Sequence, residues 1–408
     1  MNSVGILGYG AVTPFGFNVN DLTAGLRYGQ TKIQELKDSE WPNGSPLRTA
    51  ALIPTISDSE LLDKISLLLP NITKRMRHDI LKARRSLRIG LLAAAEALAQ
   101  YGSVGKINDN LALVVAGSNL FSGALSEAEA RRLSRAYPSA RHGVEMFDTH
   151  AVALISEVFS CRGYGITAGA ASASGIAALI IGIDLLKSGR AEYCLIVGMP
   201  ADLGAADWLG INMIGAMADS RILPDDSLCR PFDKAASGFV PGEMAGAVLL
   251  GQPESTNLRI TGSALRLSGS SQPNPSLESE IRVMREALIS AELVPKELDL
   301  VSAHATSTPL GDATEADAIT KLIGENTCVN APKGLIGHGL NVAGLVETIV
   351  VVSQITNGFL HPNLNLESPV KPLRYIGAVA IEQSVNKVLK SSFGFGGFNA
   401  SIVVEKCA

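Results

Sequence analysis

The segment Gly169-Ala170-Ala171-Ser172-Ala173-Ser174-Gly175 lies where an expected strand meets an expected helix. The helix is predicted over residues 173–188, because apolar side chains recur there at helical spacing: Ile176, Leu179, Ile180, Ile183 and Leu186. A serine is thus expected at the junction between a strand and an apolar helix.

Outward from this junction, strands and helices alternate along the whole chain. Expected strands are residues 5–7, 111–116, 194–198, 258–263, 298–303, 378–382 and 390–392. Expected helices are residues 86–101, 148–159, 173–188, 277–291, 312–322 and 342–355. A polar break at 251–254 divides the chain into an N-terminal half, 1–251, and a C-terminal half, 252–408. The alternation predicts mostly parallel sheets covered by helices, in a layered α/β fold of two duplicated halves.

Composition excludes several classes of protein. The 408 residues are 46% hydrophobic and 18% charged, which is enough apolar material for a large core. Lys plus Arg number 35 against 39 Asp plus Glu, so a general nucleic-acid binder is not expected. Five cysteines without a CxxC pair argue against disulfides and a zinc site, and fit the reducing cytoplasm. No signal peptide is visible, and the longest apolar run, 175–183, is too short to span a membrane.

The opening segment Gly8-Tyr9-Gly10-Ala11-Val12-Thr13 superficially suggests a dinucleotide site. It lacks the third glycine, and no acidic residue is clearly placed about 20 residues on to bind a ribose. We therefore expect a tight turn after the first strand, and no nucleotide cofactor.

Three later segments carry further chemistry. They are Ala303-His304-Ala305-Thr306-Ser307-Thr308-Pro309-Leu310-Gly311-Asp312, with Glu315 one helical turn later; Lys333-Gly334-Leu335-Ile336-Gly337-His338-Gly339; and Ser391-Ser392-Phe393-Gly394-Phe395-Gly396-Gly397-Phe398-Asn399-Ala400. Together with the segment around Ser172, they form an ordered and regularly spaced set that is more specific than any single motif.

In this order the chain resembles the β-ketoacyl-acyl-carrier-protein synthases, the condensing enzymes of the thiolase superfamily. The resemblance runs nearly end to end and includes Gly10-Ala11-Val12-Thr13-Pro14 and Arg230-Pro231-Phe232-Asp233. It implies a thiolase fold with five layers, α/β/α/β/α, and a homodimer or a pseudo-symmetric heterodimer. It also implies no directly bound cofactor, and a substrate carried on the phosphopantetheine of an acyl carrier protein.

The same resemblance assigns roles to individual residues. Ser172 occupies the position of the family's nucleophilic cysteine. The catalytic histidines match His304 and His338, the lysine matches Lys333 and the helix glutamate matches Glu315. The glycine-rich loop with Phe395 and Gly396 matches the family's and is expected to gate the pocket.

The serine changes the expected chemistry. A thiol is partly ionised at neutral pH, whereas a serine hydroxyl needs an adjacent general base, so acyl loading on Ser172 is expected to be inefficient. Decarboxylation of a malonyl thioester needs only donors to the enolate oxygen, which His304 and His338 supply. Lys333 is expected to set the protonation state of the histidines.

The chain is similar to decarboxylating ketosynthases with Ser in place of Cys, found in polyketide β-branching cassettes beside an HMG-CoA-synthase-like enzyme. We therefore predict decarboxylation of malonyl carrier protein to acetyl carrier protein. Two alternatives stay open: a non-catalytic chain-length-factor subunit paired with an active ketosynthase, and a serine acyltransferase with His304 or His338 as base.

One basic cluster includes Lys74, Arg75 and Arg77. A solvated helical face is one interpretation of it. The other is a docking site for an acidic carrier protein, since the remainder of the chain is acidic overall.

Overall fold

The computed structural model describes residues 3–37, 48–102, 110–137, 139–219 and 224–407. Within these residues, eleven strands form one sheet in the order β12-β10-β9-β14-β15-β8-β1-β7-β6-β4-β5. The strands are β1 (Val4–Val12), β2 (Gln34–Glu35), β3 (Thr49–Ala50), β4 (Leu111–Ala116), β5 (Gly165–Ala168), β6 (Tyr193–Gly198), β7 (Ala245–Gly251), β8 (Leu258–Leu267), β9 (Leu300–Ser302), β10 (Cys328–Asn330), β11 (Phe359–Leu360), β12 (Arg374–Tyr375), β13 (Ile381–Glu382), β14 (Lys387–Gly394) and β15 (Phe398–Lys406).

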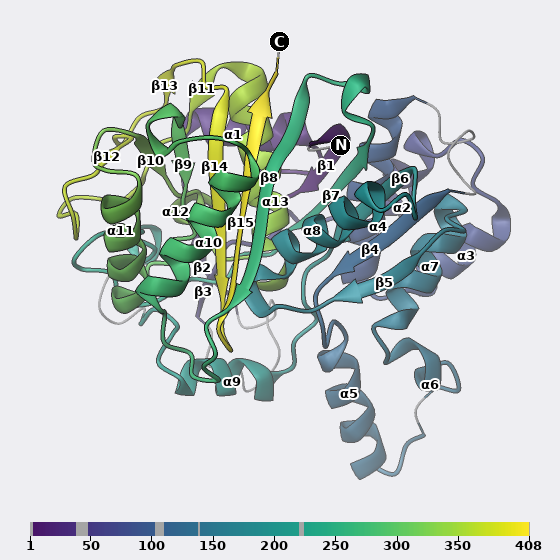
Figure 1. Ribbon diagram of the computed structural model, residues 1–408. Helices are drawn as coiled ribbons and strands as arrows, with labels where there is room; N and C mark the ends of the chain where they lie inside the picture. The colour runs from purple at the N-terminus through teal and green to yellow at the C-terminus, as the bar shows by residue number, and fades with distance from the viewer. Residues whose placement is uncertain (1–2, 38–47, 103–109, 138, 220–223, 408) are drawn as a thin grey trace.

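The helices cover both faces of this sheet (Figure 1). They are α1 (Val19–Tyr28), α2 (Asp58–Leu68), α3 (Lys74–Lys82), α4 (Arg85–Tyr101), α5 (Ser122–Leu133), α6 (His142–Glu145), α7 (Thr149–Phe159), α8 (Ser174–Lys187), α9 (Ala205–Met213), α10 (Leu277–Ser290), α11 (Pro309–Leu322), α12 (Lys333–Ile336) and α13 (Ala343–Asn357). Two short 3₁₀ helices, η2 (Ala171–Ala173) and η6 (Leu340–Val342), directly precede α8 and α13.

The two halves of the sheet repeat one pairing pattern. In the first half, β1 pairs with β7 and β7 with β6, both antiparallel, while β6–β4 and β4–β5 are parallel. In the second half, β8–β15 and β15–β14 are antiparallel, while β14–β9 and β9–β10 are parallel. Among the described residues, the two half-sheets pair through a short antiparallel contact of Val4 and Gly5 with Ile260 and Arg259. This repetition is the duplication expected from the sequence.

The expectation of mostly parallel sheets was wrong. β7 and β15, which the sequence pattern did not reveal, each run antiparallel to both of their neighbours. The division at residues 251 and 252 stays a prediction; β7 ends at Gly251 and β8 begins at Leu258.

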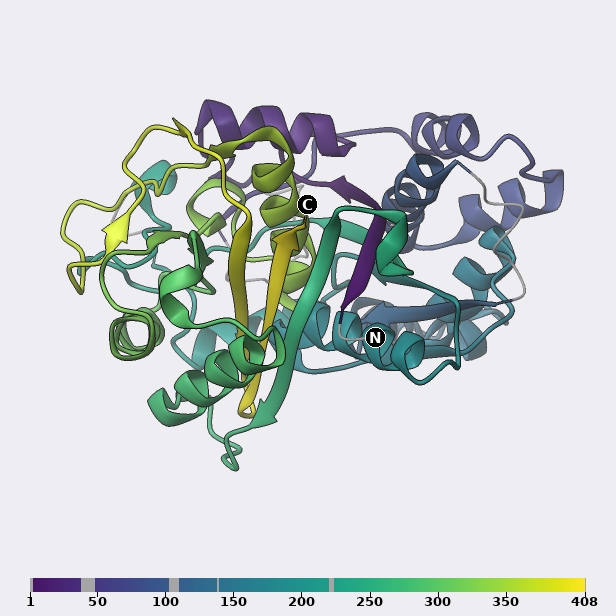
Figure 2. The ribbon, with the colours of Figure 1, turned by 45° about the horizontal axis from the view of Figure 1, so that its top comes forward.

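The three largest apolar cores lie between layers of helix and sheet, whose arrangement Figures 1 and 2 show from two directions. The middle core contains α8 and α13, which contact each other between the half-sheets. A second core lies under α4, which covers β1 and β7, and a third under α10, which covers β8 and β15. β4 is entirely apolar because both of its faces are buried. Ala112, Val114 and Ala116 face the middle core, and the residues between them face the second core.

The tight turn expected at residues 8–13 was also wrong, because β1 continues to Val12. Its glycines serve close helix packing instead. A Cβ at Gly8 would lie 2.1 Å from the carbonyl oxygen of Ala97, and one at Gly10 would lie 2.1 Å from that of Ala93. Glycine in this strand thus lets α4 pack directly on the backbone of β1.

One stretch among the described residues, Leu340–Asn357, is long and apolar enough to cross a membrane by composition alone. It contains α13, and 83% of it is buried inside the fold. Its hydropathy therefore reflects the middle core.

Candidate functional site

Ser172 lies in η2, between the end of β5 and the start of α8. The turn is held by Ser174, whose Oγ accepts a hydrogen bond from the Ala170 amide at 2.8 Å and donates to the Ala171 carbonyl at 2.7 Å. Ala171 has a φ of +47°, a conformation that non-glycine residues rarely adopt. Such strain is typical of functional turns, and here it presents the side chain of Ser172 to a cavity.

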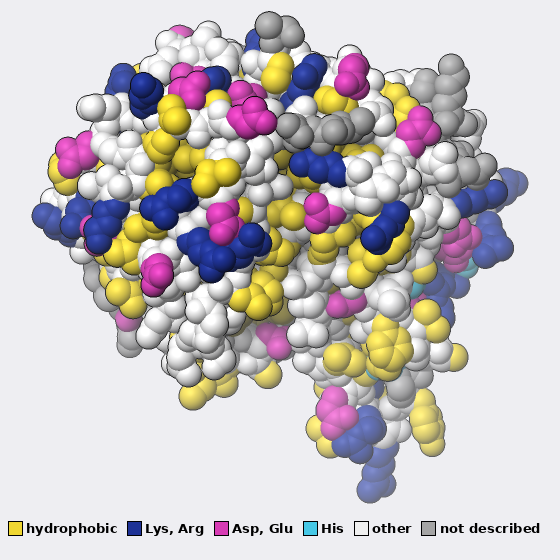
Figure 3. Space-filling view, viewed as in Figure 1, with side chains coloured by type: hydrophobic (Ala, Val, Ile, Leu, Met, Phe, Trp, Pro, Cys, Tyr) yellow, Lys and Arg dark blue, Asp and Glu magenta, His cyan; other side chains and the backbone are white. Residues whose placement is uncertain are grey.

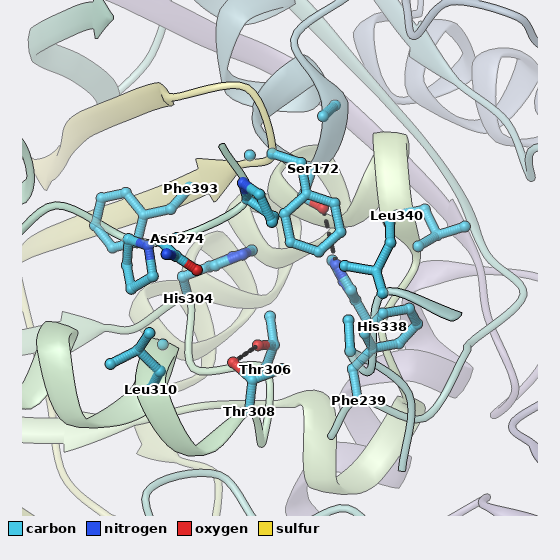
Figure 4. Close-up of a pocket in the computed structure, with 18 of the residues that line it drawn as sticks. Ser172, Phe239, Asn274, His304, Thr306, Thr308, Leu310, His338, Leu340 and Phe393 are labelled. Carbon is cyan, nitrogen blue, oxygen red and sulfur yellow. Dashed lines mark hydrogen bonds between the residues drawn. The ribbon is translucent and has the colours of Figure 1, made fainter. Parts of the chain in front are cut away.

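His338 stands opposite Ser172. The Ser172 Oγ lies 3.0 Å from Nε2 of His338, as the dashed line in Figure 4 marks. Nδ1 of His338 is buried and has no hydrogen-bond partner. Within the part of the chain that the structure describes, no carboxylate orients the imidazole, so the pair is not extended into a Ser-His-Asp arrangement.

His304 follows β9 and is positioned by two groups. Glu315, on α11, accepts hydrogen bonds from the backbone amides of His304 at 2.7 Å and Ala305 at 2.6 Å. Burial raises the pKa of Glu315, and these two bonds act in the opposite direction. Lys333 approaches Nδ1 of His304 at 3.3 Å and also donates to its backbone carbonyl.

The lysine contact fixes the tautomer of His304. A lysine ammonium has donors and no acceptor, so Nδ1 of His304 must accept and its proton must lie on Nε2. The rings of His304 and His338 meet edge to face, with centroids 5.5 Å apart at 81°.

A buried charge cluster, which we define as Lys333, Glu347 and Lys390, lies behind the histidines. Glu347, on α13, forms an ion pair with Lys333 and, at 2.6 Å, with Lys390 of β14. Lys390 also donates to the carbonyls of Ala303 at 3.2 Å and Ser391 at 2.6 Å. The sequence analysis missed Glu347 and Lys390. The available signal was a charged residue inside an apolar run, since uncompensated burial of charge is costly.

Both imidazoles are neutral in this environment. Burial lowers the pKa of His304 well below its usual range, and the nearby Lys333, His338 and Lys390 lower it further. Burial, Lys333 and Lys390 likewise lower the pKa of His338.

The cavity shared by these groups measures about 570 Å³. Ser172, His304, His338 and Phe393 line it, and Figure 4 shows Thr306, Thr308, Asn274 and Leu310 around the same space. Phe395 also lines the cavity and is 42% exposed. Gly396 is outside the lining residues, and its φ of +80° forms the turn of this loop. The gating role of Phe395 and Gly396 stays a prediction.

The basic cluster lies away from this cavity, on α3. Arg75 pairs with Glu157 at 3.3 Å, and Arg77 donates to the Ser66 hydroxyl at 2.7 Å. Lys74 is exposed. Basic side chains are visible in Figure 3 at the edge of the molecule where α3 lies.

Comparison with known families gives two matches that together span most of the chain. The profile of the β-ketoacyl synthase N-terminal domain matches residues 1–255, and that of the β-ketoacyl synthase C-terminal domain matches residues 258–367.

Two curated relatives align with nearly the full length. A polyketide biosynthesis malonyl-ACP decarboxylase of Bacillus subtilis is 30% identical, over 98% of this chain and 97% of its own. A putative mitochondrial 3-oxoacyl-[acyl-carrier-protein] synthase of Schizosaccharomyces pombe is 28% identical, over 100% of this chain and 99% of its own.

Solved structures share the fold. The ishigamide ketosynthase/chain length factor superposes with a TM-score of 0.86 at 23% identity, covering 100% of this chain and 99% of that one. A type II polyketide ketosynthase solved with its acyl carrier protein gives 0.85 at 19% identity, with 100% and 99% coverage.

Proposed function

Because the chain belongs to the β-ketoacyl synthase family, we propose that it decarboxylates malonyl carrier protein to acetyl carrier protein, as a supplier of acetyl groups for polyketide β-branching. The single observation that carries this proposal is a pair of buried, neutral imidazoles facing a cavity in which serine replaces the family's cysteine.

The proposed reaction uses the imidazoles as hydrogen-bond donors. The carbon–carboxylate bond of the malonyl group breaks, CO₂ leaves, and the electron pair forms an enolate whose charge gathers on the thioester oxygen. Because Nδ1 of His304 faces Lys333, we assign the donor proton of His304 to Nε2. Preorganised donors of this kind are each worth ~10²–10³ in rate. Protonation of the enolate carbon completes the acetyl group.

The serine acyltransferase alternative lacks a competent base. His338 is within hydrogen-bond reach of Ser172, but its depressed pKa makes it a weak base. Its other ring nitrogen has no orienting carboxylate. Two buried lysines would also oppose the positive charge that His338 gains by taking the serine proton.

The chain-length-factor alternative does not explain the buried charge cluster. Burial of two lysines and a glutamate brings a large desolvation cost, and replacing such groups by apolar residues is often neutral or stabilising. A purely structural subunit has no need of neutral, oriented imidazoles, so retention of the cluster favours catalysis.

Carrier protein is the partner that this reaction requires, and we place the enzyme in the cytoplasm, which suits its five free cysteines. A homodimer is proposed from the outermost strand of the sheet. β5 lies at the sheet's end with Ile166 exposed, and an uncovered strand edge is a template for pairing with a second chain.

The test is mass spectrometry of malonyl-loaded carrier protein incubated with the enzyme. We expect loss of one CO₂ from the arm, abolished in His304→Ala and retained in Ser172→Ala. No loss above an enzyme-free control would refute the decarboxylase and favour the chain-length-factor alternative. A covalent acyl group on Ser172 would instead support the acyltransferase.

A further inference from the structure

A buried carboxyl that the proposed mechanism does not use lines the same cavity. Glu280, in the first turn of α10, is 1% exposed and shares the cavity wall with Ser172, His304 and His338. Its Oε2 has no hydrogen-bond partner among the residues that the structure describes. Buried polar atoms are nearly always hydrogen-bonded, so an unpartnered carboxyl oxygen at a cavity wall requires an explanation.

Its surroundings favour the acid form of Glu280. Burial raises the pKa of Glu280 well above its usual range, and the carboxyls of Glu315 and Asp312, on α11, raise it further. Asp312 lines the cavity as well; burial raises its pKa to about 7, and its Oδ1 also has no partner.

Among the described residues packed against α10, no positive group lowers the pKa of Glu280. Lys321 of α11 and Arg285 of α10 are exposed to solvent. The strands β8, β14 and β15 carry charges that are engaged elsewhere: Arg266 pairs with Glu286, Lys387 with Glu297 and Lys390 with Glu347, while Glu405 accepts from Thr261. Arg259 and Lys406 lie at the far ends of their strands, where residue 406 pairs with residue 258. On α10 itself, Arg282 is paired with Glu286. Surroundings of this kind favour the protonated form of a carboxyl.

The proposed reaction needs such a proton. Conversion of a malonyl thioester to an acetyl thioester and CO₂ consumes one proton at the carbon that loses the carboxylate. The Nε2–H of His304 is needed at the enolate oxygen, and Lys333 is engaged with His304 and Glu347.

We propose that Glu280 is the acid that protonates the enolate carbon. In this step the enolate's electron pair forms the new C–H bond, the Glu280 O–H bond breaks, and the carboxylate that remains regains a proton from solvent. The inference rests on the proposed decarboxylase function. In condensing enzymes this enolate attacks an acyl group. Here the enolate carbon would instead be protonated.

The test compares Glu280→Gln with Glu278→Gln. Glu278 is an exposed glutamate on the same helix turn, so it provides a matched control for the substitution. The rate of acetyl formation is measured from neutral to alkaline pH. The ratio of hydrogen to deuterium in the new methyl group is measured in mixed H₂O and D₂O, because this ratio depends on the proton donor even when CO₂ loss limits the rate.

We expect Glu280→Gln to be slower by about 10²-fold, within the range for general acid catalysis. The wild-type enzyme should lose activity as pH rises through the raised pKa of Glu280, and the variant should lose this alkaline limb and change its isotope ratio. Glu280→Asp, which keeps an acid, should recover part of the rate together with the limb.

Equal rates, limbs and isotope ratios in Glu280→Gln, Glu278→Gln and the wild type would overturn the assignment of Glu280 while leaving the decarboxylase intact. Absence of CO₂ release by the wild-type enzyme would instead overturn the proposed function, and the role of Glu280 with it.

Discussion

At the residue scale, the state of the two imidazoles depends on charges that never reach the cavity. Lys333 orients His304, while Glu347 holds Lys333 and Lys390 together at the centre of the fold. Lys333 and Lys390 lower the pKa of both histidines and so oppose their protonation. Charged groups outside the cavity thus influence the protonation of the two imidazoles that serve as hydrogen-bond donors.

Lys390→Met should shift the pH dependence of decarboxylation. The imidazoles act while neutral, so activity is lost as pH falls through their pKa. Removal of one nearby positive charge raises that pKa, and the acid limb should move to higher pH by about one unit. Lys387→Met, on the same strand but paired with Glu297 at the surface, is the control and should leave the profile unchanged. An unmoved limb in Lys390→Met would show that Lys390 serves stability alone.

Glu347→Gln should affect stability more than any other change in the cluster. It leaves two lysines buried side by side without their shared anion, and loss of one partner from a buried ion pair costs about 3–5 kcal/mol. Chemical denaturation should show a reduced free energy of unfolding at an unchanged slope with denaturant. The double variant with Lys390→Met should recover part of the loss, since one uncompensated charge is then removed; a strictly additive loss would contradict this account.

At the scale of elements, the site depends on the contact between α8 and α13. Each helix begins at a short 3₁₀ turn, η2 or η6, and these turns touch one another. Ser172 lies in the first turn, and His338 lies just before the second. The close approach requires Gly175, where a Cβ would lie 2.3 Å from the backbone nitrogen of Leu345.

Gly175→Ala should therefore separate the two helices. Overpacking of a dense core costs about 1–3 kcal/mol, and the shift should also lengthen the distance between Ser172 and His338. Gly210→Ala, in α9, is the matched control because a Cβ there would meet nothing within 4 Å. It should be neutral or slightly stabilising, as alanine favours helix. Thermal unfolding and the rate of CO₂ release measure the two effects; a Gly175→Ala variant as stable as the control would refute the packing argument.

At the scale of the whole molecule, the sequence predicts the elements and site residues that have a recognisable local pattern. β4 and α10 were found from their apolar patterns, and Ser172, His304 and His338 from short segments. β7 and β15 were missed, although both are long. In β7 both faces are buried, so its Gly- and Ala-rich run lacks a period of two. Lys390 and Glu347 were missed because their ion pair joins elements that are distant in the sequence, and a local pattern cannot predict such a pair.

Docking of carrier protein is the property that belongs to the molecule as a whole, because steering by charge acts over long distances. On α3, Arg75 and Arg77 are partly engaged with Glu157 and Ser66, so their reversal would mix docking with stability. Lys74 is exposed, and Lys74→Glu is therefore the cleaner test.

If α3 guides an acidic carrier protein, the KM of the Lys74→Glu variant for malonyl carrier protein should rise several-fold at unchanged kcat. Added salt should shrink the difference, since it screens charges beyond about 8–10 Å. Lys187→Glu, an exposed lysine at the end of α8, changes the net charge equally and should leave KM unaltered. Equal KM values for both variants would mean that carrier protein approaches the cavity by another face, and that the charges of α3 are only a solvated surface.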